Sequence, residues 1–75
     1  MDYKEIEAIY VDVKGGCIKF ENFVVIRKSN NYFSVLDKFG HEITSGESFN
    51  NAVKKAKLLQ IGYNSARDCY ESWRY

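Results

Sequence analysis

The chain has 75 residues, of which 45% are hydrophobic, 16% aromatic and 28% charged. Eleven basic and ten acidic residues leave a formal net charge of +1, which excludes a protein that binds nucleic acid by bulk neutralisation of phosphates. The length predicts a single compact domain over residues 1–75, and the aromatic content excludes an intrinsically disordered chain.

The N-terminal segment allows two interpretations. Residues 6–13 are rich in β-branched and aromatic types and predict a strand, followed by a two-residue hairpin turn at Gly15-Gly16. A capping-box pattern at Asp2 and Glu5 favours an N-terminal helix instead. We prefer the strand.

The middle of the chain predicts a hairpin, because two β-type runs at residues 23–28 and 32–37 flank Ser29-Asn30-Asn31. Upstream, Glu21-Asn22 interrupts the alternation, so residues 17–28 form either one strand with a bulge or two strands. Downstream, a turn at Lys38-Phe39-Gly40-His41 leads into a short strand at Glu42-Ile43-Thr44.

The hydrophobic period then changes from two to 3.6. Ser48 is a good N-cap for a helix from Phe49 to about Ile61, with Gly62 as its C-terminal stop. One apolar stripe of this helix is predicted to pack on the sheet: Phe49, Ala52, Val53, Ala56 and Leu59.

Leu58 and Ile61 fall outside that stripe and need a cover of their own. A second, shorter helix would supply it, capped by Asn64 or Ser65 with Asp68 completing a capping box. Its apolar face would hold Ala66, Cys69, Tyr70 and Trp73. The predicted fold class is therefore α+β: an antiparallel β-sheet of four or five strands against one main helix, with a short C-terminal helix.

Two stretches, YFSVLDKFG at 32–40 and TSGESFNNAVKKAK at 44–57, resemble the HicB antitoxin domain. They match an aromatic-rich strand, an Asp-x-x-Gly turn, a Thr-x-Gly-Glu-Ser-Phe helix entry and an Ala-x-x-x-Ala-Lys helix, and with the preceding strand the resemblance covers about residues 23–59. It implies a partial RNase H-like fold without catalytic carboxylates, which works by covering an RNase toxin. Plant AP2-type and integrase-arm DNA-binding domains are similar three-strand-plus-helix units.

The sequence contains few candidates for catalytic residues. Asp37, Glu42 and Glu47 would be ligands of a nuclease-type metal centre, but all three fall at predicted turns, where solvated carboxylates are usual. His41 stands beside a turn glycine, which favours a surface position over the role of a base for a cysteine nucleophile. The sequence predicts no catalytic residue, metal or cofactor, and a protein that is not an enzyme.

Two sets of side chains are candidates for binding. Four C-terminal residues are predicted to anchor a partner protein: Tyr63, Tyr70, Trp73 and Arg74. The basic residues that would hold a nucleic-acid backbone are Arg27, Lys28, Lys54, Lys55 and Lys57.

The preferred function is a small protein-binding module that inhibits another enzyme by steric occlusion. A HicB-like antitoxin or an anti-defence protein of a phage or mobile element, aimed at a toxin or host nuclease, fits this expectation. The alternative is a nucleic-acid-binding regulatory module that uses the lysine face of the helix. The acidic N-terminus and short apolar runs predict no signal peptide, no membrane contact and a cytoplasmic protein with reduced cysteines. A homodimer is compatible with either function.

Overall fold

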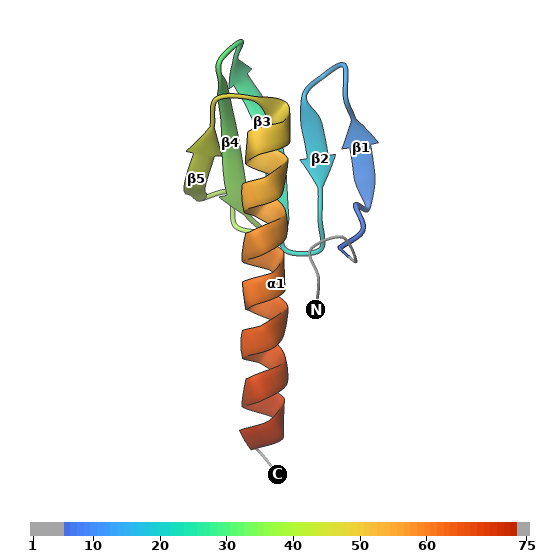
Figure 1. Cartoon of the computed structure of the whole chain (residues 1–75), viewed down its shortest axis with the longest axis vertical. Helices are drawn as coiled ribbons and strands as arrows, with labels where there is room; N and C mark the ends of the chain where they lie inside the picture. The colour runs from blue at the N-terminus through green and yellow to red at the C-terminus, as the bar shows by residue number, and fades with distance from the viewer. Residues whose placement is uncertain (1–5, 74–75) are drawn as a thin grey trace.

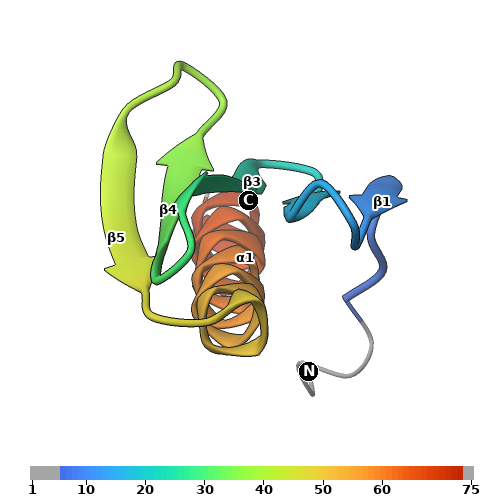
Figure 2. The ribbon, with the colours of Figure 1, turned by 90° about the horizontal axis from the view of Figure 1, so that it is seen from above.

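A five-stranded antiparallel sheet and one helix make up the fold. The computed structural model describes the backbone of residues 6–73 and the side chains of residues 6–68. Each strand pairs with the next one along the chain, and the sheet curves around the helix (Figures 1 and 2). The predicted α+β class, with an antiparallel sheet on one main helix, is confirmed. The elements are β1 (Tyr10–Asp12), β2 (Cys17–Lys19), β3 (Phe23–Ser29), β4 (Tyr32–Asp37), β5 (Glu42–Gly46) and α1 (Phe49–Trp73).

Of the strand preferred at residues 6–13, β1 confirms Tyr10–Asp12, and the predicted two-residue turn after it was wrong. Asp12 pairs with Cys17, so the loop between β1 and β2 has four residues. The Asp12 carboxylate accepts a hydrogen bond from the Gly15 N–H at 2.9 Å, and the Gly16 N–H donates to the Val13 carbonyl at 3.2 Å. These bonds satisfy the backbone of a longer loop, which a glycine pair alone does not reveal.

The break at Glu21-Asn22 is a turn between two strands, and not a bulge in one. The Phe20 N–H donates to the Phe23 carbonyl at 2.7 Å, and β2 pairs with β3 in antiparallel fashion. The hairpin between β3 and β4 is confirmed, with a tighter turn than predicted because Ser29 already pairs with Tyr32.

The core lies between α1 and the concave face of the sheet. Its fully buried members include Phe20, Val25 and Val35 from the strands and Ala52 and Ala56 from the helix. Alanines bring the helix axis close to the sheet, which makes the junction between β5 and α1 tight. A Cβ on Gly46 would lie 2.7 Å from the Ala52 backbone nitrogen, so this position requires glycine.

The predicted start of the helix is confirmed. The Asn51 N–H donates to Ser48 Oγ at 3.2 Å, and the Ala52 N–H donates to the Ser48 carbonyl at 3.0 Å. Ser48 therefore satisfies backbone donors that the first helical turn would otherwise leave unpaired.

The predicted end of the helix at Gly62 was wrong, and so was the separate C-terminal helix. Gly62 has no positive φ, and α1 runs through it to Trp73. A side-chain bond from Gln60 Nε2 to Asn64 Oδ1, at 3.0 Å, spans the glycine, so Asn64 lies inside the helix and does not cap a new one. A continuous helix cannot fold back over itself, and Leu58 consequently remains 62% exposed, while Ile61 packs at the edge of the core.

Within residues 6–73, no helix combines the length and the apolar character that crossing a membrane requires.

Candidate protein-interaction surface

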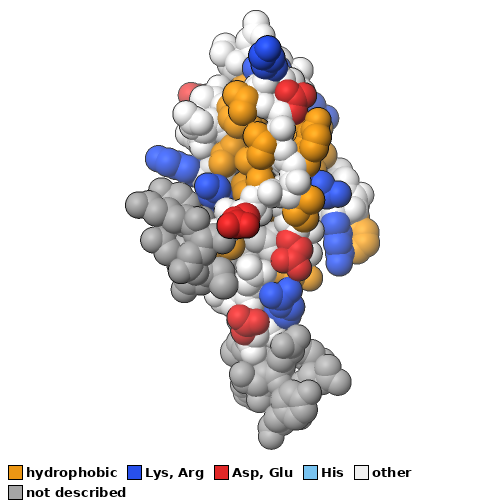
Figure 3. Space-filling view, turned by 90° about the vertical axis from the view of Figure 1, so that its right-hand side faces the viewer, with side chains coloured by type: hydrophobic (Ala, Val, Ile, Leu, Met, Phe, Trp, Pro, Cys, Tyr) orange, Lys and Arg blue, Asp and Glu red, His pale blue; other side chains and the backbone are white. Residues whose placement is uncertain are grey.

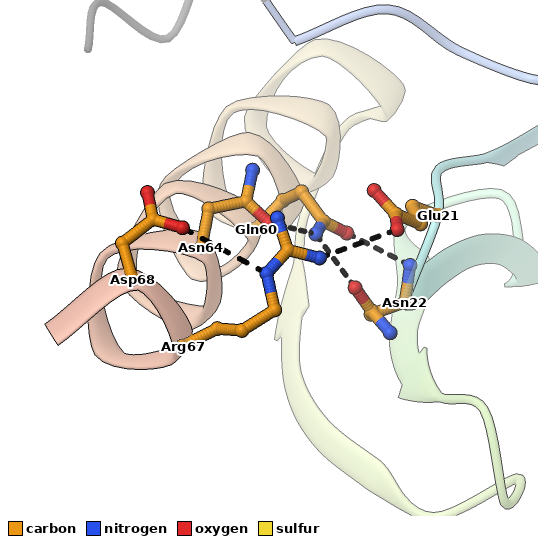
Figure 4. A network of polar contacts seen from close by, with 6 residues as sticks. All are labelled: Glu21, Asn22, Gln60, Asn64, Arg67 and Asp68. Atoms are coloured by element: carbon orange, nitrogen blue, oxygen red, sulfur yellow. Dashed lines mark hydrogen bonds and ion pairs between the residues drawn. The ribbon is translucent and has the colours of Figure 1, made fainter. Parts of the chain in front are cut away.

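A buried pair of amides fixes α1 to the turn between β2 and β3 (Figure 4). Gln60 is only 1% exposed. Its Oε1 accepts from the Asn22 backbone N–H at 2.8 Å, and its Nε2 donates to Asn22 Oδ1 at 2.8 Å and to Asn64 Oδ1 at 3.0 Å. One helical turn after Asn64, Arg67 Nη1 lies 3.5 Å from the exposed Glu21 carboxylate. The position of the helix relative to this end of the sheet is therefore set by directional bonds as well as by packing.

The Asp37 carboxylate holds the loop between β4 and β5 in its conformation. The Asp37 carboxylate accepts hydrogen bonds from the backbone N–H groups of Phe39 and His41, both at 2.9 Å, and lies 3.5 Å from the His41 ring nitrogen Nδ1. The His41 backbone bond is the largest cause that lowers the pKa of Asp37 below its ordinary value of 3.8. The ionised carboxylate thus holds a loop whose tip carries Phe39, a side chain that is 74% exposed.

An apolar groove, which we call the corner groove, lies between the Gln60–Asn22 amide contact and the β4–β5 loop. It has a volume of about 340 Å³. Tyr63 forms one wall and contacts the Phe23 ring edge-to-face, with 6.4 Å between ring centroids. Its apolar lining comes from β3, the β4–β5 loop, β5 and α1: Phe23, Phe39, Ile43, Leu59 and Tyr63. Asn22, Asp37 and Lys38 form a polar rim around this lining.

The size and lining of this groove suit an apolar side chain. Hot spots of protein interfaces are pockets with aromatic walls and a polar rim, held in shape before the partner arrives. Two of the groove walls are preformed, because the amide pair positions α1 and the Asp37 carboxylate positions the loop.

The second half of α1 continues past the end of the sheet beside this groove (Figure 1). The whole helix has 25 residues and is therefore about 37 Å long. Of the predicted partner-binding residues, Tyr63 lies at the base of this projecting part and is 39% exposed. The side chains of Tyr70 and Trp73, and the whole of Arg74, lie outside the described residues.

The sequence alone did not identify Phe23, Phe39 or Ile43 as part of a surface. Phe39 gave the clearest signal, because a large apolar residue inside a predicted turn has no strand or helix face to bury it. The other two lie in predicted strands, where an apolar residue is expected in the core, and only the three-dimensional end of the sheet leaves them at a groove.

Two of the basic residues predicted to hold nucleic acid, Arg27 and Lys28, lie on opposite faces of the sheet. Arg27 pairs with Phe33 on the helix side of the sheet, and its guanidinium carbon lies 5.4 Å from the Phe33 ring centroid. Lys28 lies close enough to Glu42, a hydrogen-bond partner of Ser34, that its charge contributes to lowering the Glu42 pKa.

The lysines of α1 differ in their surroundings. Lys55 Nζ donates to the Ser45 carbonyl of β5 at 2.6 Å, so this ammonium group is engaged by the sheet. Lys54 is exposed and Lys57 is half-buried.

The acidic residues considered for a metal centre are also separated. Glu42 accepts hydrogen bonds from the Tyr32 hydroxyl, at 2.9 Å from each carboxylate oxygen, and from Ser34 Oγ. The Ser34 bond is the largest cause that lowers the pKa of Glu42 below its ordinary value of 4.5, followed by the Tyr32 bond. Asp37 serves the β4–β5 loop instead, and the described part of the chain brings no three His, Cys, Asp or Glu side chains together at metal-binding distance.

No protein-family model, no curated protein and no solved structure matches the chain.

Proposed function

We propose that the protein is a small protein-binding module that inhibits another enzyme by covering the entrance to its active site. The observation that carries this proposal is the corner groove, an aromatic-walled site at the base of a helix that projects beyond its sheet. The resemblance of residues 23–59 to the HicB antitoxin domain supports the same function, with a toxin or a defence nuclease as the enzyme.

The shape of the molecule supports a steric mechanism. A projecting helix is a rod about 10–12 Å wide, which is narrow enough to enter an active-site cleft. Beside it, the corner groove would receive one apolar side chain from the rim of that cleft, most simply an aliphatic or aromatic residue on a helix that packs along α1. Occlusion of this kind needs no chemistry from the inhibitor, and its specificity comes from how well the groove fits its occupant.

The experiment that tests this proposal is capture of partners from the lysate of the native host by the tagged protein, with and without nuclease treatment. Phe39→Ser removes the most exposed wall of the groove, and Leu58→Ser is a matched control on the outer side of α1. We expect one stoichiometric protein that survives nuclease treatment, that Phe39→Ser loses by at least about tenfold and that Leu58→Ser retains, since one buried hot-spot residue contributes about 2 kcal/mol.

The captured enzyme is then assayed with increasing amounts of the purified protein. Inhibition that saturates at equimolar protein, and that Phe39→Ser weakens in parallel with capture, is the expected result. Full enzyme activity in the presence of a saturating amount of bound protein would refute inhibition. Capture that disappears with nuclease and with the pair Lys54→Glu and Lys55→Glu would transfer the function to nucleic-acid binding.

A further inference from the structure

Strand β1 forms one edge of the sheet and carries an apolar surface that nothing in the described chain covers. Figure 3 looks at this side of the molecule and shows hydrophobic side chains gathered in its upper half. Ile9, Tyr10, Val11 and Val13 expose between 52% and 67% of their surface. Edge strands of monomeric proteins are usually protected by charge, proline or a bulge, because their free backbone groups pair with other strands. β1 is short and contains Asp12, but these four exposed residues along the edge are apolar.

We propose that β1 pairs with β1 of a second copy of this chain, in antiparallel orientation, to make one continuous ten-stranded sheet. A two-fold axis perpendicular to the sheet keeps equivalent faces on the same side, so each residue must lie opposite a residue of equal parity. Within β1 this leaves registers centred on Tyr10, Val11 or Asp12.

The side chains favour the register centred on Val11. It places Val11 opposite Val11 of the second copy and, when the pairing extends by one residue beyond each end of β1, Ile9 opposite Val13, so the apolar residues meet one another. It also places Tyr10 opposite Asp12, so no two like charges face each other within β1.

The other two registers are unfavourable. Centring on Asp12 puts two carboxylates opposite each other at the axis, and centring on Tyr10 puts the charged Glu7 opposite Val13. The exposed edge is therefore self-complementary in one register, which is what pairing with a second copy requires.

The first test is the molar mass of the full chain by sedimentation equilibrium between about 5 and 500 µM, the range in which a small interface dissociates. We expect the mass to rise from that of a monomer to that of a dimer. Val11→Lys places two ammonium groups at the axis and should keep the chain monomeric throughout, while Leu58→Lys, an equally exposed substitution on α1, should dimerise like the wild type.

A second measurement tests the register and does not depend on Val11→Lys being folded. With Cys17 and Cys69 replaced by serine, Val11→Cys should form a disulfide-linked dimer under mild oxidation, because opposite residues in antiparallel strands have Cα atoms about 4.5–5.5 Å apart. Ile9→Cys alone should not, since Ile9 faces Val13 of the second copy.

Three results would overturn the proposal: a wild-type chain that is monomeric at about 500 µM, a dimer that persists in Val11→Lys, or cross-linking of Ile9→Cys as efficient as that of Val11→Cys.

Discussion

Replacing Gly62 with alanine separates the continuous helix from the two-helix arrangement that the sequence predicts. In the structure Gly62 is exposed inside α1, and a Cβ at this position meets no atom within 4 Å. Alanine restricts the unfolded chain and favours the helical backbone, so Gly62→Ala should raise the free energy of unfolding by about 0.8–1.0 kcal/mol. For a domain of this size, that gain corresponds to an increase in Tm of about 4–8 °C.

If the helix ended at Gly62, the same substitution would have the opposite effect. A glycine that terminates a helix has a positive φ, and a side chain there is strained by about 1–2 kcal/mol. The two arrangements therefore differ in the sign of the change, and the difference between them is about 2–3 kcal/mol.

Thermal and urea unfolding, followed by circular dichroism, measure this change directly. Gly46→Ala is the matched control, because its new Cβ would meet the Ala52 backbone nitrogen at 2.7 Å and should destabilise the fold by about 1–3 kcal/mol. A lower Tm for Gly62→Ala, together with reduced helical signal, would refute the continuous helix.

Other predictions concern the polar contacts. Gln60→Leu leaves the Asn22 N–H and the Asn22 and Asn64 amide oxygens without partners, and it should lower the free energy of unfolding in urea by about 2–4 kcal/mol. Arg67→Ala removes a partly exposed ion pair and should lower it by less than about 1 kcal/mol. Equal losses would contradict the role given to the Gln60 hydrogen bonds in fixing α1 to the sheet. The Asp37 pKa is lowered on folding, so its carboxylate contributes stability that is complete above pH 3.8 and is lost as the pH falls through the lower, folded-state pKa. Asp37→Asn should therefore show a shallower loss of stability as the pH falls below 3.8, measured by urea unfolding at each pH.

The sequence predicted the parts of the fold that depend on local patterns. The hairpin of β3 and β4, the cap at Ser48 and the apolar stripe of α1 all follow from residue spacing within about ten positions. Gly62 was misleading because glycine is common both at helix ends and, less often, inside them. The contacts that decide between the two are made by Gln60 with Asn22, 38 positions away in the chain, and no local pattern contains them.

The candidate site was predictable only in part, for a related reason. Tyr63 was found because aromatic residues crowd the C-terminal segment, but its partner Phe23 is 40 positions away and is identified only by the ring contact. The basic set is divided at Arg27 and Lys28, which are adjacent in sequence, because neighbouring residues of a strand point to opposite faces.

The corner groove and the β1 edge are separate surfaces, and the two-fold symmetry of the proposed dimer determines how they would be combined. A two-fold axis perpendicular to the sheet turns the second copy of α1 antiparallel to the first, so the two projecting ends of α1 point in opposite directions. The corner groove lies beside the β4–β5 loop, at the other side of the sheet from β1, so pairing through β1 covers neither groove. A dimer would therefore bind two enzyme molecules, one at each end, without gaining avidity for a single active site. Dimerisation would set the stoichiometry of the complex, while the fit of one side chain in the groove would set its affinity.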